Sequence, residues 1–357
     1  MKALDRHSAI SHQPSAISGQ PIPAFPSGAA DRDRFILDRR GPRTAHDPWR
    51  YQDLIVEDEP TAEGPVARIA TVFLTGRECP WRCAMCDLWL HTTEVDTPPG
   101  AIPAQLAAAR QTLACEPGAV TRMKLYNAGS FFDPRAVPEN DYDEIAVQLS
   151  GLTHVVVESH PALIGPRVER FLQALERCHD PGSPPHLEVA MGLETAHPEA
   201  LEQLHKRMTL DGFRLAADQL RQRAVALRAF LLVSPPFVPA EEQDDWLLRS
   251  IDFAFSSGAT VVSLIPTRAG NGTLEALAQE RLFRAPQLTD IERSLELAYR
   301  HFPGRGRIFV DLWALDRFSN CACCFEKRQD RLQTMNLEQR LLPEIRCPGV
   351  NNAKIKI

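Results

Sequence analysis

Short apolar runs alternate with helical stretches from about residue 66 onwards, and this alternation limits the fold more than any other feature of the sequence. The apolar runs are rich in β-branched residues and nearly continuous, which is typical of parallel strands buried on both faces. Six such strands indicate an α/β barrel or an open parallel sheet, and we expect a partial (β/α)6 TIM-like barrel. The expected strands span 67–74, 122–127, 154–158, 187–193, 226–233 and 260–265. The expected helices span 104–114, 139–150, 164–178, 198–207, 211–223 and 241–257.

The sequence on either side of this repeat has a different composition, which predicts three parts. Residues 8–21 contain a doubled unit, SAISHQP and SAISGQP, that is rich in Ser, Pro and Gln. Because such a unit offers few side chains to a core, we expect residues 1–45 to form a disordered tail. We assign residues 46–270 to the barrel core and residues 271–357 to a cysteine-bearing C-terminal extension.

The C-terminal extension carries signals for further elements. Thr289 and Glu292 match a capping box and predict a helix to about residue 301. The run RIFVDLW (307–313) predicts one more strand, and a charged helix follows it.

Length and composition exclude several classes of protein. Of the 357 residues, 44% are hydrophobic and 24% are charged, which is ordinary for a soluble globular chain. No apolar run approaches the roughly 20 residues of a membrane span, and the N-terminus lacks the apolar core of a secretory signal. We therefore expect a cytoplasmic protein without a membrane partner, whose nine cysteines are reduced, metal-bound or catalytic. The net charge of −6 does not indicate a nucleic-acid coat protein.

Three cysteines follow the first expected strand in one short loop, ECPWRCAMCDLW. Cys79, Cys83 and Cys86 have the spacing C-x3-C-x2-C. Loops after the carboxyl ends of barrel strands build active sites, and thiolates in such a loop can hold a soft metal centre. A [4Fe-4S] cluster usually takes four cysteines, so three ligands leave one iron open for a substrate or cofactor. A zinc site and plain burial of the thiols are the alternatives.

This cysteine loop, placed after the first strand of a six-fold α/β repeat, resembles the radical S-adenosylmethionine (SAM) superfamily. The resemblance implies an enzyme in which Cys79, Cys83 and Cys86 hold a [4Fe-4S] cluster whose open iron binds the methionine part of SAM. One electron then cleaves SAM to methionine and a 5′-deoxyadenosyl radical, which abstracts hydrogen from the substrate. A flavodoxin-like or ferredoxin-like electron donor is implied as a partner. The family commonly has an aromatic residue where this chain has Met85, whose thioether can pack on the adenine ring.

The resemblance also implies that residues after the second strand receive the SAM amino group. The family has a small, Gly-rich motif at this place, and Asn127, Gly129 and Ser130 occupy it here. Glycine lets a ligand approach the backbone closely. An ordinary turn at the end of the strand is the alternative.

Three later strand ends complete the implied SAM pocket. Glu158 and Glu194 end the third and fourth strands, where a carboxylate accepts hydrogen bonds from ribose hydroxyls or an amine. The segment GLET around Glu194 resembles the subgroup of the methylthiotransferases and the elongator catalytic subunit. In that subgroup an arginine at the place of Arg207 pairs with the SAM carboxylate, which suits its planar fork. A solvated helix-end arginine is the alternative, and Ile265 lies where the family's backbone contacts adenine.

Five segments together resemble, more narrowly, the radical SAM lyase family that completes archaeosine in archaeal tRNA. They are ECPWRCAMCDLW, KLYNAGSFFDPRAVP, VVVESHP, EVAMGLET and VSLIPTRAG. This likeness implies a lyase that acts on a modified tRNA base, with tRNA as a partner. A radical SAM enzyme with a small-molecule substrate is the alternative. His160, Arg268 and Asn271, on loops at the barrel mouth, are the candidates to face the substrate.

A second set of cysteines lies in the C-terminal extension. Cys321, Cys324 and Cys347, with Cys323 as a spare, hold a zinc ion or a second iron–sulfur cluster, or they are unbridged thiols. Two other function classes stay open. One is a zinc-dependent nucleic-acid-binding module that uses both cysteine sets, and the other is an electron-transfer protein without SAM chemistry.

Overall fold

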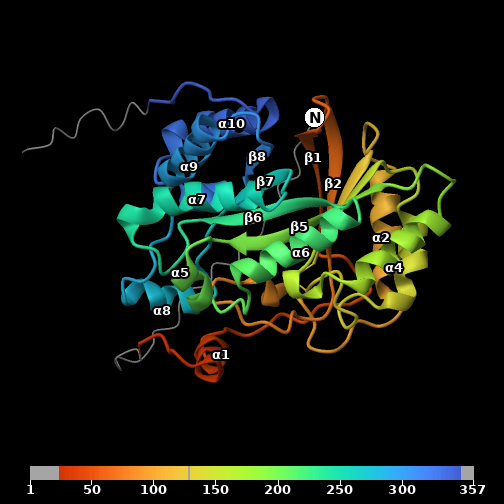
Figure 1. Ribbon diagram of the computed structural model, residues 1–357, viewed down its shortest axis with the longest axis horizontal. Coiled ribbons are helices and arrows are strands. Elements are labelled where there is room, and N and C mark those ends of the chain that lie inside the picture. The colour runs from red at the N-terminus through yellow and green to blue at the C-terminus, as the bar shows by residue number, and fades with distance from the viewer. Residues whose placement is uncertain (1–23, 128, 347–357) are drawn as a thin grey trace, which may run out of the picture.

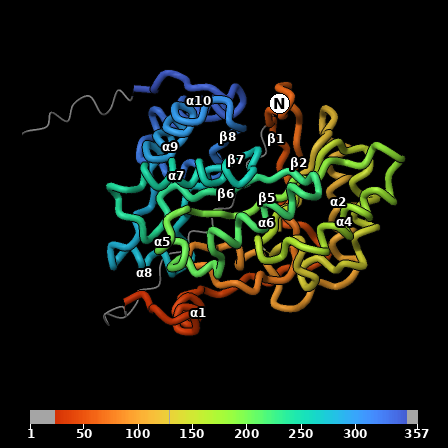
Figure 2. Tube along the Cα trace, viewed as in Figure 1, coloured from red at the N-terminus to blue at the C-terminus, as the bar shows by residue number. Residues whose placement is uncertain are grey.

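The computed structural model of the chain describes residues 24–127 and 129–346. Its centre is one sheet of eight strands in the order β1-β2-β3-β4-β5-β6-β7-β8, curled into a half-barrel with helices around it (Figures 1 and 2). β1 runs antiparallel to β2, and each later neighbouring pair is parallel. The strands are β1 (Asp53–Pro60), β2 (Val66–Leu74), β3 (Arg122–Asn127), β4 (His154–Glu158), β5 (His186–Glu194), β6 (Ala226–Val233), β7 (Val261–Pro266) and β8 (Arg307–Val310).

Helices follow the parallel strands and cover the outer side of the sheet (Figure 1). The α-helices are α1 (Ala29–Leu37), α2 (Ala101–Leu113), α3 (Tyr142–Gln148), α4 (Pro166–Arg177), α5 (Pro198–Gln203), α6 (Leu210–Gln222), α7 (Gln243–Ser256), α8 (Thr273–Gln279), α9 (Leu288–His301) and α10 (Ala322–Glu338). The short 3-10 helices are η1 (Leu88–His91), η2 (Glu139–Asp141), η3 (Pro161–Leu163), η4 (Ala240–Glu242) and η5 (Leu315–Phe318).

The predicted partial barrel is confirmed, since all six expected parallel strands are present within one or two residues of their predicted bounds. The additional strand expected at 307–313 is β8, which ends earlier, at Val310. The extension therefore continues the sheet of the core. No helix in the described parts of the chain is long and apolar enough to cross a membrane.

Strand β1 was not expected from the sequence. Its segment DLIVEDEP is rich in acidic residues and ends in proline, which strands generally avoid. The strand forms because it pairs with β2 over its whole length and because Glu59 forms ion pairs with Lys124 and Arg228. Tertiary pairing thus overrides a weak local propensity.

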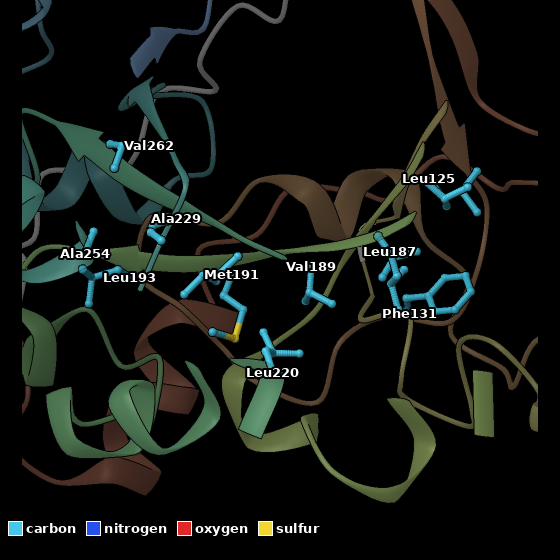
Figure 3. Packing of buried hydrophobic residues seen from close by; sticks show 14 of the residues in the cluster. Leu125, Phe131, Leu187, Val189, Met191, Leu193, Leu220, Ala229, Ala254 and Val262 are labelled. Atoms are coloured by element: carbon cyan, nitrogen blue, oxygen red, sulfur yellow. The ribbon is translucent and has the colours of Figure 1, made fainter. Parts of the chain in front are cut away.

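The outer face of the sheet packs against the helices and forms the main hydrophobic core. In β5, the side chains of Leu187, Val189, Met191 and Leu193 belong to this core (Figure 3). The period of two along a strand sends the alternate residues, such as Glu188, to the other face of the sheet. The strands are therefore apolar on their outer face and partly polar on their inner face, although the sequence suggested apolar runs on both.

Buried charges fill the inner face of the sheet near the start of the strands. Arg228 on β6 pairs with Glu59 at 2.6 Å and with Glu188 at 2.5 Å. Lys124 on β3 also pairs with Glu59, at 2.7 Å. Burial opposes the charge of Glu59, but Arg228 and Lys124 outweigh it and hold the pKa of this carboxyl well below its usual range. These ion pairs link β1, β3, β5 and β6 near the amino ends of the parallel strands.

Part of the expected N-terminal tail is folded. Residues 1–23 lie outside the described part of the chain, but helix α1 follows them and buries Phe35 and Ile36. Arg32 donates a hydrogen bond to the main-chain oxygen of Glu202, at the end of the molecule where α5 and α8 also lie (Figure 1). Two apolar side chains one after the other give the helix a face that packs on the barrel, which the polar composition of the tail concealed.

The capping box expected for the helix after residue 287 is formed by other residues. α9 begins at Leu288, and its capping residues are Gln287 and Asp290. The Asp290 side chain accepts a hydrogen bond from the Gln287 amide at 2.8 Å. Glu292, which was expected to cap, instead pairs with arginines of α10.

Candidate metal and cofactor site

The cysteine loop begins after β2 and lies at the carboxyl ends of the parallel strands. Its backbone is fixed from several elements. The amide of Ala84 donates to the main-chain oxygen of Leu204 at 2.9 Å, and the Asn271 side chain donates to the oxygens of Ala84 and Cys86 at 2.8 and 3.3 Å. Hydrogen bonds from two other segments of the chain therefore fix the backbone of the loop.

Glu78 anchors the start of the loop through an arginine cluster. Its carboxylate pairs with Arg40 at 2.7 Å, with Arg82 at 3.1 Å, and with Arg43. The Arg40 guanidinium also lies over the ring of Trp89, 4.8 Å from its centroid. Arg40 and Arg43 therefore hold the start of the cysteine loop, and their charges are paired inside the protein.

The thiols of Cys79, Cys83 and Cys86 are largely buried and lie close enough to affect each other electrostatically. Burial raises the pKa of Cys79 and of Cys83 to about 12, and it raises the pKa of Cys86 as well. Neighbouring thiols add to the increase. Since thiolates are the metal-binding form, these thiols ionise when a metal replaces their protons.

The spacing of these thiols distinguishes between two kinds of metal centre. Among the described residues, their sulfur atoms do not form a group that lies within 4.8 Å of one another. Thiolates that share one zinc ion lie about 3.8 Å apart, as the Zn–S bond length and tetrahedral geometry require. The wider arrangement fits a multi-iron cluster better than a single ion.

Lys206 is a buried cation between the cysteine loop and two carboxylates. Its Nζ atom lies 2.5 Å from Oε1 of Glu194. Burial opposes the charge of Lys206, but Glu194 and Cys83 outweigh it, so that its pKa is raised. Burial raises the pKa of Glu158 to about 8, although Lys206 acts in the opposite direction. The lysine thus joins Cys83, Glu158 and Glu194 into one electrostatic group.

A β-bulge places Glu194 in this group. The register of β5 against β6 shifts between Gly192 and Glu194, and Glu194 has a φ of 68°. A Cβ on Gly192 would overlap both Glu194 Oε1 and Lys206 Nζ. The glycine of the GLET segment therefore leaves room for the ion pair between Glu194 and Lys206. The bulge orients the Glu194 carboxylate toward Lys206.

Arg207, which was predicted to bind the SAM carboxylate, points away from this group. Its side chain is 47% exposed and pairs with Asp33 of helix α1. His205 and Arg207 have φ values of 58° and 56°. These left-handed residues turn the chain so that Lys206, and not Arg207, faces the carboxylates. The sequence analysis missed Lys206, whose signal was its position beside the expected arginine.

Asn127 and Gly129 at the end of β3 have the features of a ligand cradle. Both polar atoms of the Asn127 side chain are buried and have no hydrogen-bond partner among the described residues. A Cβ on Gly129 would lie 2.5 Å from the main-chain oxygen of Arg77 and 2.9 Å from Cβ of Ala136. Ser130 is buried, and its hydroxyl oxygen accepts a hydrogen bond from the His160 amide at 2.9 Å. An unsatisfied buried amide beside a glycine is available for a polar ligand.

The three candidates to face the substrate have structural partners in this structure. His160 stacks on Trp81 at 3.6 Å, and its Nε2 lies 3.0 Å from the main-chain oxygen of Lys206. Arg268 pairs with Asp311 at 2.6 Å. Asn271 holds the cysteine loop, as described above.

Met85 and Ile265 occupy different surroundings. Met85 packs against a small apolar cluster that includes Leu274, Leu277 and Phe283, so its side chain already has a hydrophobic partner. Ile265 lies near the end of β7 and is partly exposed.

A cavity of about 220 Å³ lies between the ends of β5 and β6 and helices α7 and α9. Glu194 lines this cavity and also belongs to the site, but none of the cysteines lines it.

Two members of the predicted second cysteine set, Cys321 and Cys324, lie together in the structure. The sulfur atoms of Cys321, Cys323 and Cys324 lie within 4.8 Å of one another, so that Cys323 is a member and not a spare. Cys347 lies outside the described residues. The basic residues beside this set are also paired, since Arg328 and Arg331 contact Glu292.

Comparison with known proteins gives relatives by sequence as well as by structure. No protein-family model matches the chain. The sequence is 25% identical over 303 residues to archaeosine synthase subunit beta of Methanosarcina acetivorans, which covers 82% of this chain and 83% of the relative. The predicted resemblance to archaeosine synthase is thereby confirmed.

Several solved structures are also similar. SuiB of Streptococcus suis, bound to S-adenosylmethionine, has a TM-score of 0.49 and 11% identity over 68% of this chain, which spans 51% of SuiB, or about half of its length. Elp3 of Methanocaldococcus infernus has a TM-score of 0.49 and 12% identity over 68% of this chain and 62% of Elp3. The radical SAM enzyme HemN of Escherichia coli, a coproporphyrinogen III oxidase, has a TM-score of 0.42 and 11% identity over 71% and 63% of the two chains. Radical SAM enzymes are thus among the proteins that this chain resembles, as predicted.

Proposed function

We propose that this chain is a radical SAM enzyme in which Cys79, Cys83 and Cys86 hold a [4Fe-4S] cluster. The observation that carries the proposal is the group of three buried thiols beside the buried cation Lys206, at the carboxyl edge of a parallel half-barrel. The three sulfur atoms do not all lie within 4.8 Å of one another, which suits a multi-iron cluster better than the zinc alternative. When bound, the cluster supplies the electron that cleaves SAM to methionine and a 5′-deoxyadenosyl radical.

The charges near the thiols suit an anionic ligand set. Lys206 and Arg40 both act on Cys83 so as to lower its pKa, against the larger effect of burial. Arg40 acts in the same direction on Cys86. Three thiolates in a buried site need such cations, because an uncompensated buried charge is costly. The two basic residues therefore fit the role of stabilising the ligated form of the loop.

The residues around Lys206 match the methionine part of SAM, which carries one ammonium and one carboxylate. Lys206 offers a cation to the carboxylate, and Glu194 offers an anion to the ammonium. Burial raises the pKa of Glu158 to about 8, so this carboxyl would lose its proton beside the ammonium. The Asn127 amide, which has no partner among the described residues, can bind either group. In this proposal Gly129 and Ser130 shape the same cradle, and Ile265 and Met85 remain candidates for the adenine side.

The finer proposal is that the substrate is a modified tRNA base. It rests on the similarity to archaeosine synthase subunit beta, whose name refers to a modified nucleoside, and on the five resembling segments. A small-molecule substrate is the second candidate, and one observation favours it. Arginines near both ends of the chain are engaged in internal ion pairs, for example Arg40 with Glu78 and Arg331 with Glu296, which leaves fewer cations for phosphate.

The setting of the enzyme follows from its chemistry. We place it in the cytoplasm, where thiols stay reduced, and we expect a flavodoxin-like or ferredoxin-like electron donor. We also divide the chain into a barrel core, residues 46–270, and a C-terminal extension that adds β8 to the sheet.

The decisive experiment is anaerobic reconstitution of the full chain with iron and sulfide, followed by dithionite and SAM. The expected product is 5′-deoxyadenosine, and the Cys83→Ala variant should form none above background. Cys115→Ala is the matched control, because Cys115 is exposed and lies outside the cysteine loop. Equal product from wild type and Cys83→Ala would overturn the proposal.

The substrate is tested separately by binding. The reconstituted chain is titrated with bulk tRNA at several salt concentrations in a gel-shift assay. A tRNA substrate predicts binding whose affinity falls steeply with salt, because phosphate contacts release counterions. Absence of a shift at low salt would reject tRNA and leave the radical SAM assignment untouched.

A further inference from the structure

The cysteines Cys321, Cys323 and Cys324 form a second thiol cluster at the start of α10. Their sulfur atoms all lie within 4.8 Å of one another, and those of Cys321 and Cys323 are 3.1 Å apart. Among the described residues this is the one group of three or more His, Cys, Asp or Glu side chains that is compact enough for a single metal ion. We name it the α10 cysteine cluster.

The three sulfur atoms of the α10 cysteine cluster are close enough together to reach one tetrahedral ion. A thiolate lies about 2.3 Å from zinc, so two thiolates on one ion are about 3.8 Å apart. The thiols of Cys79, Cys83 and Cys86 are not grouped this closely. The chain therefore carries two cysteine sets with different geometry, one wide and one compact.

The surroundings of the α10 cysteine cluster favour ionised sulfur. Cys321 is the N-cap residue of α10, a helix of 17 residues, and Cys323 and Cys324 lie in its first turn. The positive end of a helix dipole favours negative charge at such positions. The Arg328 guanidinium, which the Cys324 side chain contacts, adds a full positive charge.

We propose that the α10 cysteine cluster binds one Zn²⁺ ion through three thiolates. Binding forms three Zn–S bonds and releases one proton from each thiol, with no oxidation or reduction. The proposal is independent of the radical SAM function and needs neither iron nor SAM. It changes the predicted set by placing Cys323 among the ligands.

The place of α10 gives the ion a structural role. β8 is the edge strand of the sheet, and its outer backbone groups bond to side chains of α10 and of Gln339, the residue that follows this helix. The Asn336 side chain accepts from the Val310 amide at 3.0 Å and donates to the Val310 oxygen at 2.8 Å. Gln339 bonds to Ile308 in the same two-way manner, at 2.8 and 2.9 Å. An ion that fixes the first turn of α10 would therefore stabilise the packing of this helix against β8, the edge strand of the sheet.

Zinc content of the purified full chain is the first test. The chain is produced with added zinc, passed into metal-free buffer and measured by mass spectrometry of the elements. We expect one zinc per chain. The variants Cys321→Ser, Cys323→Ser and Cys324→Ser should each retain at least tenfold less zinc, whereas Cys115→Ser should retain the wild-type amount.

Cobalt substitution gives a second test, whose first readout uses the wild-type chain alone. The wild-type chain loaded with Co²⁺ alone should show the visible absorption of tetrahedral cobalt bound to several thiolates. The Cys79→Ser/Cys83→Ser/Cys86→Ser variant should show the same spectrum. The proposal is overturned if the wild-type spectrum lacks these bands, if the three α10 variants keep their zinc, or if the triple variant loses it.

Discussion

The Asn271 side chain lies 2.8 Å from the main-chain oxygen of Ala84 and donates a hydrogen bond to it, in the middle of the cysteine loop. The same amide group donates to the oxygen of Cys86 at 3.3 Å, and its Oδ1 accepts from the Leu274 amide at 2.8 Å. Asn271 is buried, and it links the segment after β7 to the loop after β2. The conformation of the cysteine loop therefore depends on a residue almost 200 positions away.

Replacing Asn271 by alanine should weaken both the fold and the metal site. The substitution leaves the Ala84 oxygen and the Leu274 amide without this partner, which costs about 2–4 kcal/mol in the free energy of unfolding. Because the loop then loses its fixed shape, we expect iron retained per chain after reconstitution to fall at least threefold. Urea unfolding and iron analysis measure the two effects.

Asn336→Ala is the control for a general loss of stability. Asn336 also makes two hydrogen bonds to one main-chain segment, but on β8, far along the chain from the cysteine loop. We expect a comparable loss of stability without loss of iron. Equal iron retention in both variants would show that Asn271 does not position the cysteine loop.

Lys206→Met should abolish tight SAM binding by the reconstituted chain. If Lys206 pairs with the SAM carboxylate, its loss should raise the dissociation constant at least tenfold in calorimetric titration. The variant also leaves Glu194 buried without its cation, which costs about 3–5 kcal/mol of stability. In Lys206→Met/Glu194→Gln both charges are removed, so stability should recover largely while SAM binding stays weak.

Arg207→Met separates the two basic neighbours. Arg207 pairs with Asp33 near the surface and not with the carboxylates of the site. We therefore expect its replacement to change SAM affinity by less than threefold. A large loss of affinity in Arg207→Met, with little in Lys206→Met, would support the role that the sequence resemblance implies for Arg207.

The parallel part of the fold could be predicted because each strand carries its own apolar pattern. β1 could not, since its acidic residues become favourable only beside Lys124 and Arg228, which arrive from β3 and β6. In the same way, the fold of α1 depends on a docking surface built by later segments. Local propensity does not predict elements whose stability comes from contacts with distant parts of the chain.

Some residues of the candidate site could be predicted from the sequence and others could not. The cysteines follow from spacing alone, and the glutamates follow from their places at strand ends. The choice between Lys206 and Arg207 depends instead on two left-handed backbone residues, His205 and Arg207, and on the room left by Gly192. Non-glycine residues with positive φ are uncommon, so a reading of the sequence does not anticipate them.

Gly129→Ala should disturb the contact between the end of β3 and the segment that leads to the cysteines. Its new Cβ would lie 2.5 Å from the main-chain oxygen of Arg77, a contact that only backbone movement can relieve. Overpacking of this kind costs about 1–3 kcal/mol in unfolding free energy, measured by thermal or urea unfolding. Gly41→Ala, which has open space around its Cβ, should change stability by less than about 0.5 kcal/mol. Equal effects of the two variants would contradict the packing argument.

His160 introduces a pH dependence of stability. Its Nδ1 accepts from the Ala162 amide at 3.1 Å, which leaves the proton of the neutral ring on Nε2 toward the main-chain oxygen of Lys206. Burial, together with the charge of Lys206, lowers the pKa of His160 to about 3. In the unfolded chain the pKa of histidine is about 6.5. Between these values the unfolded state binds one more proton than the folded state, so stability is lost as the pH falls from about 6.5 toward 3.

The prediction is that His160→Asn removes this part of the acid sensitivity. Asparagine keeps a hydrogen-bond acceptor for the Ala162 amide but does not titrate, while the lost stacking on Trp81 lowers stability at every pH by about 1–2 kcal/mol. Between pH 6 and pH 4.5, the free energy of unfolding should fall less steeply in the variant, by up to about 1.4 kcal/mol per pH unit. Urea unfolding across this range measures the slope. His186→Asn, at an exposed position, should keep the wild-type slope, and an unchanged slope in His160→Asn would show that His160 takes up its proton in the folded chain.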